Sequence, residues 1–159
     1  MSYRNRKVAA LLGSAAAITT TALVLTAGGQ AQQPAGQTLV LHASAMKISQ
    51  VDVPPLVHSK RSPETPGDEV IASSKVSGAA TGNRYLVCLA AKQGKSVETA
   101  LYSCQVTYNL ANGTITAAGV AHINPSPPIT VPITGGTGAY AGARGTLTVT
   151  ADKDTLTLQ

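Results

Sequence analysis

Residues 133–147 read ITGGTGAYAGARGTL, and this glycine-rich stretch shapes the interpretation of the whole chain. Five of its residues are glycine, and Arg144 is its single charged residue. Glycine at this density indicates a backbone that adopts conformations forbidden to a residue with a Cβ, or that passes close to another segment. We therefore expect a bulged crossing between two strands here.

The same stretch contains Gly136-x-Gly138-x-x-Ala141, which formally matches a dinucleotide-binding fingerprint. That fingerprint binds pyrophosphate only where a strand precedes it and a helix begins within it. Here a threonine-rich strand-like segment, 146–150, follows instead. The pattern favours a turn and bulge, and we expect no nucleotide or other cofactor.

On both sides of this stretch, the chain consists of short strand-like segments separated by turn residues. The alternation is clearest in TALYSCQVTYNL (99–110), where tyrosines, Cys104 and aliphatic residues share one face with a period of two. Asn112-Gly113 then predicts a hairpin, because a type I′ turn needs positive φ at both central residues. Eight strands are predicted, at 38–51, 68–79, 84–92, 97–110, 114–123, 129–134, 145–151 and 155–158.

These segments predict an all-β fold, either an up-and-down barrel or a sandwich. Pro132 lies inside the sixth predicted strand and indicates that this strand is an edge or is bulged, because proline cannot donate a ladder hydrogen bond. The chain has no Trp and no Phe. A core built from aliphatic residues and tyrosines favours a small barrel with room inside.

Cys88 and Cys104 are the two cysteines of the chain, and both fall on predicted strands. If they oppose each other in an antiparallel pair, the same register places Leu86 opposite Val106. Opposed residues are close enough for a disulfide, which an oxidising compartment would favour. The alternative is a reactive or metal-binding thiol pair, although this spacing without clustered histidines does not resemble a zinc site. We expect a structural disulfide and no metal.

The first 31 residues are typical of a secretory signal peptide. Arg4, Arg6 and Lys7 precede an uncharged run, 8–27, and Gly29-Gln30-Ala31 is a small-x-small cleavage site. The alternative is an N-terminal membrane anchor, because the run is nearly long enough to span a bilayer. Its small and hydroxylated residues keep it weakly hydrophobic, so we expect a secreted protein that is not membrane-bound after cleavage.

Cleavage after Ala31 would leave 128 residues, enough for one domain with one core. We expect a flexible leader at 32–37 and a barrel domain at 38–159. The remaining nine basic and seven acidic residues give a net charge of about +2 and are scattered along the sequence. Nucleic-acid binding needs a basic stripe or patch, so we do not expect it.

The stretch 133–147 resembles the GGTG-x-Y/F-x-x-ARG segment of the dirigent and allene oxide cyclase-like proteins. Pro66-Gly67-Asp68, the two cysteines and the segment 112–115 support the resemblance. It implies a calycin-type, eight-stranded antiparallel up-and-down barrel, often a trimer, with a ligand pocket along its axis. It also implies that a small hydrophobic or phenolic molecule binds in the lumen.

The resemblance implies candidate site residues and a reaction class. Arg144 and Tyr140 match the arginine and the aromatic position of the family motif and are the candidate catalytic residues. The activity would be that of a cofactor-free isomerase or cyclase, or of a dirigent protein that steers coupling. Side chains on predicted strands are candidates for ligand binding, namely Tyr102, Tyr108, His122 and His42.

Two acidic residues of the family have no counterpart in this chain. The plant cyclase has a glutamate in its first strand, and the dirigent proteins have an acidic residue before GGTG; 38–51 and 125–134 contain none. The alternative function is therefore a non-catalytic secreted ligand-binding or cell-surface structural module. The sequence leaves open which ligand is bound, whether it is turned over and how many copies of the chain assemble.

Overall fold

The computed structural model describes residues 36–54, 65–96, 99–123 and 127–159. The predicted signal peptide and most of the predicted leader lie outside these residues. A short 3₁₀ helix, η2 (Gly138–Tyr140), separates the seventh and eighth strands. The strands are β1 (Thr38–Ala43), β2 (Lys47–Val51), β3 (Glu69–Gly78), β4 (Gly82–Lys92), β5 (Leu101–Leu110), β6 (Gly113–Ala121), β7 (Ile129–Gly136), β8 (Gly145–Val149) and β9 (Asp154–Leu158).

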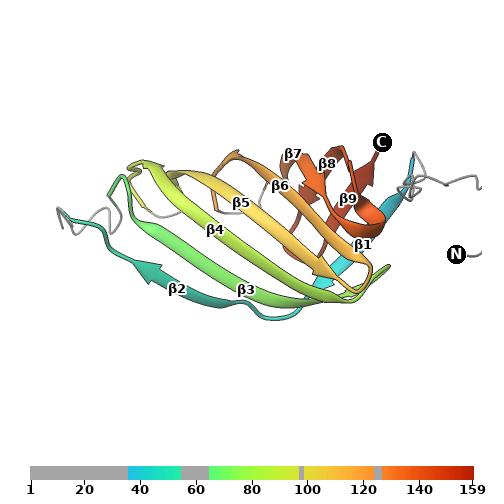
Figure 1. Ribbon diagram of the computed structural model, residues 1–159. Coiled ribbons are helices and arrows are strands. Elements are labelled where there is room, and N and C mark those ends of the chain that lie inside the picture. Colours follow the sequence, from blue (N-terminus) through green and yellow to red (C-terminus); the bar gives the residue numbers. More distant parts are fainter. Residues whose placement is uncertain (1–35, 55–64, 97–98, 124–126) are drawn as a thin grey trace, which may run out of the picture.

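The strands form one antiparallel sheet in the order β1-β9-β8-β7-β6-β5-β4-β3-β2 (Figure 1). β1 also pairs with β3, from Leu41–Gly78 to Ala43–Val76, and this second pairing closes the sheet into a ring. β2 continues along the same edge of β3. β1 and β2 therefore share one strand position, and the fold is the predicted closed eight-stranded antiparallel barrel rather than a sandwich.

The first predicted strand is broken at residues 44–46, where it has one residue more than β3 opposite it. The Ser44 backbone N–H donates to the Lys75 carbonyl at 2.9 Å. The Lys75 N–H in turn donates to Ser44 Oγ at 3.1 Å. This is a bulge, and it contains no glycine or proline that would have indicated it in the sequence.

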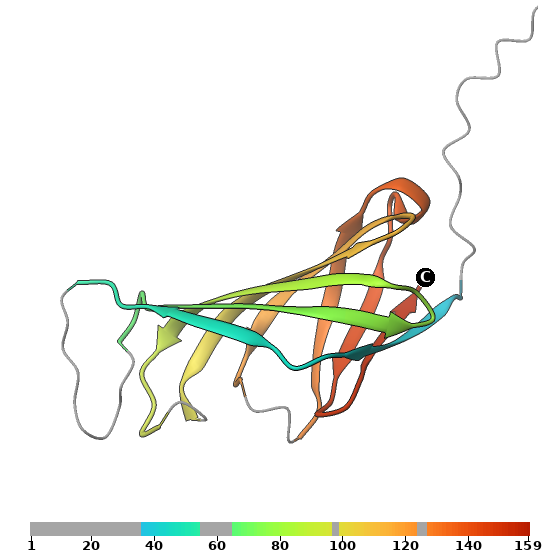
Figure 2. The same ribbon diagram turned by 90° about the horizontal axis from the view of Figure 1, so that it is seen from below.

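Strands β3, β4 and β5 are longer than β8 and β9 and extend past them, with β2 along their edge (Figures 1 and 2). Ile48 of β2 pairs with Ala72, whose side chain is buried on the inner face of β3. Ile48 is nevertheless 58% exposed. The inner surface of this extension is therefore partly accessible to solvent.

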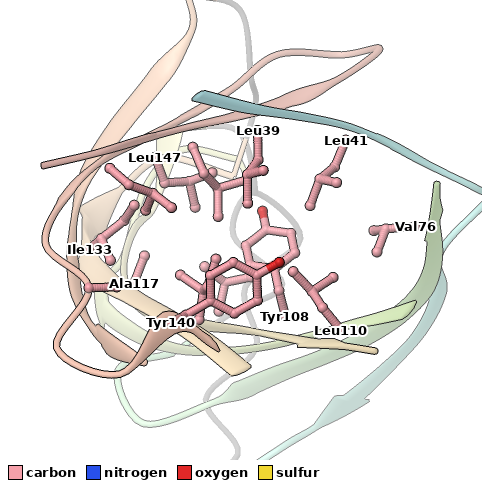
Figure 3. Packing of buried hydrophobic residues seen from close by; sticks show 14 residues of the cluster. Leu39, Leu41, Val76, Tyr108, Leu110, Ala117, Ile133, Tyr140 and Leu147 are labelled. Atoms are coloured by element: carbon pink, nitrogen blue, oxygen red, sulfur yellow. The ribbon is translucent and has the colours of Figure 1, made fainter. Parts of the chain in front are cut away.

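The period-two alternation predicted for β5 is confirmed. Tyr102, Val106, Tyr108 and Leu110 are buried on the inner face, whereas Ser103, Gln105 and Asn109 are exposed. Inward-facing apolar side chains from most of the ring fill one end of the barrel (Figure 3). The largest fully buried members of this cluster are Tyr108, Leu41, Ile115, Leu147, Leu156 and Leu158.

The Cys88–Cys104 disulfide is confirmed. The two residues oppose each other on β4 and β5, and the same ladder pairs Leu86 with Val106, as the sequence predicts. Around the disulfide lies a smaller buried cluster that includes Val70, Ala90, Ala100 and Tyr102. The disulfide therefore joins the two central long strands where the extension meets the barrel.

The predicted hairpin between β5 and β6 is present, but its turn lies one residue earlier than predicted. Leu110 pairs with Gly113, so residues 111–112 form the turn. Gly113 has a φ of 143°, and a Cβ there would lie 2.1 Å from the carbonyl oxygen of Thr137. This glycine is needed for the close approach of the segment after β7, rather than as a central turn residue.

The glycine-rich stretch is the predicted bulged crossing. The β6–β7 ladder shifts register between Thr116 and Ala117 and ends at Ala117–Ile133, before it reaches Pro132. The chain then passes over the β5–β6 turn through η2, where the Ala139 N–H donates to the Asn112 carbonyl at 2.8 Å. The crossing covers the apolar end of the barrel. Within the described ranges, no helix has the length and apolar character needed to cross a membrane.

Candidate functional site

A cavity of about 400 Å³ occupies the barrel interior at the end opposite the glycine-rich crossing. This end is formed by the segment after β1, the end of β6, the start of β7 and the β8–β9 turn. The volume lies in the range of small-molecule sites. Most of the lining is apolar, comprising Ala43, Ala45, Met46, Leu86, Val106, Ala117, Ala121, Ile123, Ile129, Val131, Leu147, Val149, Ala151 and the two disulfide cysteines.

Arg84, Asp154 and Tyr108 interrupt this apolar wall. We define the polar cluster as these residues together with Ser74, which is hydrogen-bonded to Arg84. Arg84 Nη1 donates to Asp154 Oδ2 at 2.7 Å in an ion pair. The Tyr108 hydroxyl donates to the same carboxylate oxygen at 2.8 Å. Arg84 Nε donates to Ser74 Oγ at 3.2 Å, so the guanidinium is held from two sides.

Local sequence explains why each member of the polar cluster points inward. Arg84 lies two residues before Leu86 on the inner face of β4, directly opposite Tyr108 of β5. Asp154 begins β9, whose alternating Leu156 and Leu158 are fully buried. Because strand side chains alternate between faces, the charges of β4 and β9 are directed into the same interior as the leucines.

Burial of the Tyr108 ring raises the pKa of its hydroxyl well above the ordinary value, and the Asp154 carboxylate raises it further. The phenol therefore stays protonated and acts as a hydrogen-bond donor over the physiological pH range. Because the Tyr108 hydroxyl is uncharged, the charges of the polar cluster are those of the Arg84–Asp154 ion pair, which balance each other.

Further polar side chains lie at the mouth of the cavity, among them His122, Asp152 and Lys153, which are all exposed. His122 Nδ1 lies 2.8 Å from the carbonyl oxygen of Ala100. Because a carbonyl only accepts, Nδ1 is the donor of this hydrogen bond. The hydrogen bond from Thr150 to the Asp152 carboxylate lowers the pKa of Asp152.

Two of the predicted ligand-binding residues line the cavity, Tyr108 and His122. Two others do not. The Tyr102 side chain is fully buried beside the disulfide, and its hydroxyl has no hydrogen-bond partner among the described residues. His42 is exposed on β1, with Nδ1 3.4 Å from the Asp152 carbonyl oxygen.

The structure places both predicted catalytic residues away from the cavity lining. Tyr140 packs in the apolar cluster at the opposite end of the barrel (Figure 3). Arg144 is exposed, and its Nη1 donates to the carbonyl oxygens of Thr134 at 3.1 Å and Ala143 at 2.8 Å. These bonds join the two ends of the glycine-rich crossing, which gives Arg144 a structural task.

Sequence reasoning missed Arg84 and Asp154, which form the charged centre of the site. One signal was present for Arg84. The register predicted from the two cysteines, extended by four positions, places Arg84 opposite Tyr108 on the inner face. For Asp154, the sole sequence signal was its position two residues before Leu156, which is buried. As for metals, the described residues contain no group of three His, Cys, Asp or Glu side chains placed to hold an ion.

Comparison with known proteins agrees with this architecture. No match was found among curated proteins. A solved structure described as pyocyanin demethylase is similar to this chain, with a TM-score of 0.64 and 26% identity over 77% of this chain and 100% of that one. The family model of the allene oxide cyclase barrel-like domain matches residues 64–159, which include β3 to β9. This chain therefore belongs to the allene oxide cyclase barrel-like family.

Proposed function

We propose that this protein binds a small, largely apolar ring compound in its cavity and acts on it chemically at the polar cluster. The cavity itself carries the proposal, because an apolar wall with a few convergent polar groups is the usual form of a small-molecule site. Its volume of about 400 Å³ suits a compound of two or three fused rings. The similarity to a barrel enzyme described as pyocyanin demethylase supports the same class of ligand.

Binding is tested by titrating pyocyanin and a panel of two- and three-ring compounds into the protein by calorimetry. Ala121 lines the cavity from β6, and Ala118 lies on the same strand with the opposite parity. Ala121→Phe should fill the cavity and abolish binding, whereas the matched control Ala118→Phe should leave affinity unchanged. Binding that survives Ala121→Phe would contradict the proposal, as would the absence of binding to every compound.

Catalysis is tested separately. Incubation of the protein with pyocyanin, followed by mass spectrometry, shows whether a demethylated product forms. A ligand that binds in the cavity but is recovered unchanged from the whole panel would favour the non-catalytic binding module as the second candidate function. The departures from the family's acidic positions, at 38–51 and 125–134, support that second candidate.

We also propose that the protein is exported. The N-terminal sequence has the pattern of a signal peptide, and disulfides such as Cys88–Cys104 persist mainly in oxidising compartments. Mass spectrometry of the protein recovered from the medium should find a chain that begins at Gln32. Recovery of an uncleaved chain from the cell interior would contradict export.

A further inference from the structure

We propose that the cavity selects a neutral ligand bearing a carbonyl oxygen, and that Arg84 donates the hydrogen bond that holds this oxygen. The inference rests on the proposed function, because it takes the cavity as the binding site. It concerns the chemical class of the ligand and assigns the recognition to a residue outside the motif 133–147.

Arg84 is the member of the ion pair that a ligand can reach. Its side chain is 11% exposed, whereas that of Asp154 is 1% exposed, and both line the cavity. A guanidinium has five N–H donors, and the bonds to Ser74 and Asp154 are made by Nε and Nη1. The Tyr108 hydroxyl is within reach of a third N–H, and at least two N–H groups remain to donate to an acceptor in the cavity.

The charge balance of the lining argues against an anionic ligand. Asp154 already neutralises Arg84 at 2.7 Å, and the protonated Tyr108 hydroxyl adds no charge. At the mouth, Asp152 and Lys153 have opposite charges. A bound carboxylate would add an uncompensated charge to an apolar enclosure, which is costly.

A carbonyl oxygen meets the same donors without that cost. The oxygen accepts hydrogen bonds from the free guanidinium N–H groups and adds no net charge. Without such an acceptor, these N–H groups would lose their water partners when a ligand fills the cavity. An apolar ligand without an acceptor would leave those donors unsatisfied. The site therefore disfavours anions, because they add an uncompensated charge, and hydrocarbons, because they leave the Arg84 donors without an acceptor.

The test uses three probes that share one ring system: 2-acetylnaphthalene, 2-naphthoate and 2-ethylnaphthalene, titrated into the native protein by calorimetry. The ketone should bind about tenfold or more tightly than either of the others, since a hydrogen bond from a charged donor is strong. Failure of all three to bind overturns this inference, and it overturns the proposed function as well if pyocyanin and the panel of ring compounds also fail to bind. Binding of the ethyl compound with equal or higher affinity than the ketone overturns this inference alone.

Two variants identify the residue responsible. Asp154→Asn keeps the shape of the side chain and leaves the Arg84 charge uncompensated, so affinity for 2-naphthoate should rise at least about tenfold. Arg84→Met should reduce the affinity for the ketone to that of the ethyl compound. Glu69→Gln on β3 and Arg144→Met are matched controls outside the cavity lining, and neither should change the order of the probes.

Either variant result can overturn the inference. If Asp154→Asn folds and binds 2-naphthoate no better than the native protein does, the charge balance does not govern selection. If Arg84→Met folds and still prefers the ketone, another donor holds the oxygen. Should either variant fail to fold, the three-probe comparison on the native protein remains decisive by itself.

Discussion

Arg84 and Asp154 are separated by 70 residues in the chain and form an ion pair with an N–O distance of 2.7 Å. Their strands, β4 and β9, are not neighbours in the ring, because β3 and β1 lie between them. The pair therefore crosses the barrel interior and links its two walls. The pair includes Arg84, the charged group that we expect to contact the ligand. It also connects β4 with β9, which share no backbone hydrogen bonds.

Removing one partner of this pair should be strongly destabilising. Asp154→Ala leaves a mostly buried guanidinium without its counter-charge, and we expect the free energy of unfolding to fall by about 3–5 kcal/mol in urea denaturation. The double variant Arg84→Met/Asp154→Ala has no unpaired charge and should lose less than the single variants Arg84→Met and Asp154→Ala lose together. A double variant whose loss equals the sum of the single losses would show that the two side chains are not coupled.

Tyr108 should make the folded state sensitive to alkaline pH. Burial raises the pKa of its hydroxyl in the folded state above the value of about 10 that applies to the unfolded chain. The folded state then binds more protons above this pH, so its stability is complete below about pH 10 and falls by up to about 1.4 kcal/mol per pH unit above it. Urea unfolding measured across this range gives the slope.

Tyr108→Phe is the matched variant for the alkaline transition. It removes the titrating hydroxyl, so its stability should fall less steeply above about pH 10 than that of the native protein. At neutral pH it should be less stable by about 1–3 kcal/mol, because Asp154 loses a hydrogen-bond donor. Equal alkaline slopes for the two proteins would mean that Tyr108 does not control this transition.

The disulfide should contribute to stability through the loop that it closes. The double variant Cys88→Ala/Cys104→Ala is expected to lose about 3 kcal/mol, the value for a loop of about 15 residues in the chain-entropy model. Reductant should lower the stability of the native protein to that of the variant and leave the variant unchanged. A variant as stable as the oxidised native protein would exclude this contribution.

Two glycines of the crossing provide a matched test of close approach. Gly138 and Gly142 both have positive φ, at 61° and 78°. A Cβ at Gly138 would lie 2.4 Å from the Asn112 carbonyl oxygen, whereas nothing lies within 4 Å of one at Gly142. Gly142→Ala should cost about 1 kcal/mol and Gly138→Ala clearly more, measured by thermal unfolding. Equal losses would show that only the backbone angle matters.

The strand content and the disulfide register could be predicted because both depend on short-range patterns. Period-two alternation defined the inner face of β5, and two cysteines on adjacent strands defined its register against β4. The bulge at residues 44–46 could not be predicted, because it depends on how this segment pairs with β3, which no local pattern reports. The position of the β5–β6 turn depended on the approach of Thr137 to Gly113, a contact between distant segments.

The site was harder to predict than the fold. The family motif predicts Tyr140 and Arg144 as site residues. In this structure Tyr140 packs in the apolar cluster, and Arg144 is hydrogen-bonded across the glycine-rich crossing. Arg84 is one of the basic residues scattered along the sequence, although its parity on β4 places it inside the barrel. Its pairing with Asp154 depends on ring closure through β1 and β3, and no local sequence pattern reports which strands meet when a sheet closes.

The double pairing of β1 also bears on the order in which the protein folds. The hairpins from β3 to β6 join strands that follow one another in the chain, whereas β1 must find β9 over more than a hundred residues. Contacts between distant segments form late, because the loop-closure entropy is lost before they are made. We therefore expect Arg84 to gain its counter-charge late in folding, when β1 pairs with both β3 and β9 and closes the ring. The last step of folding and the completion of the binding site would then be one event.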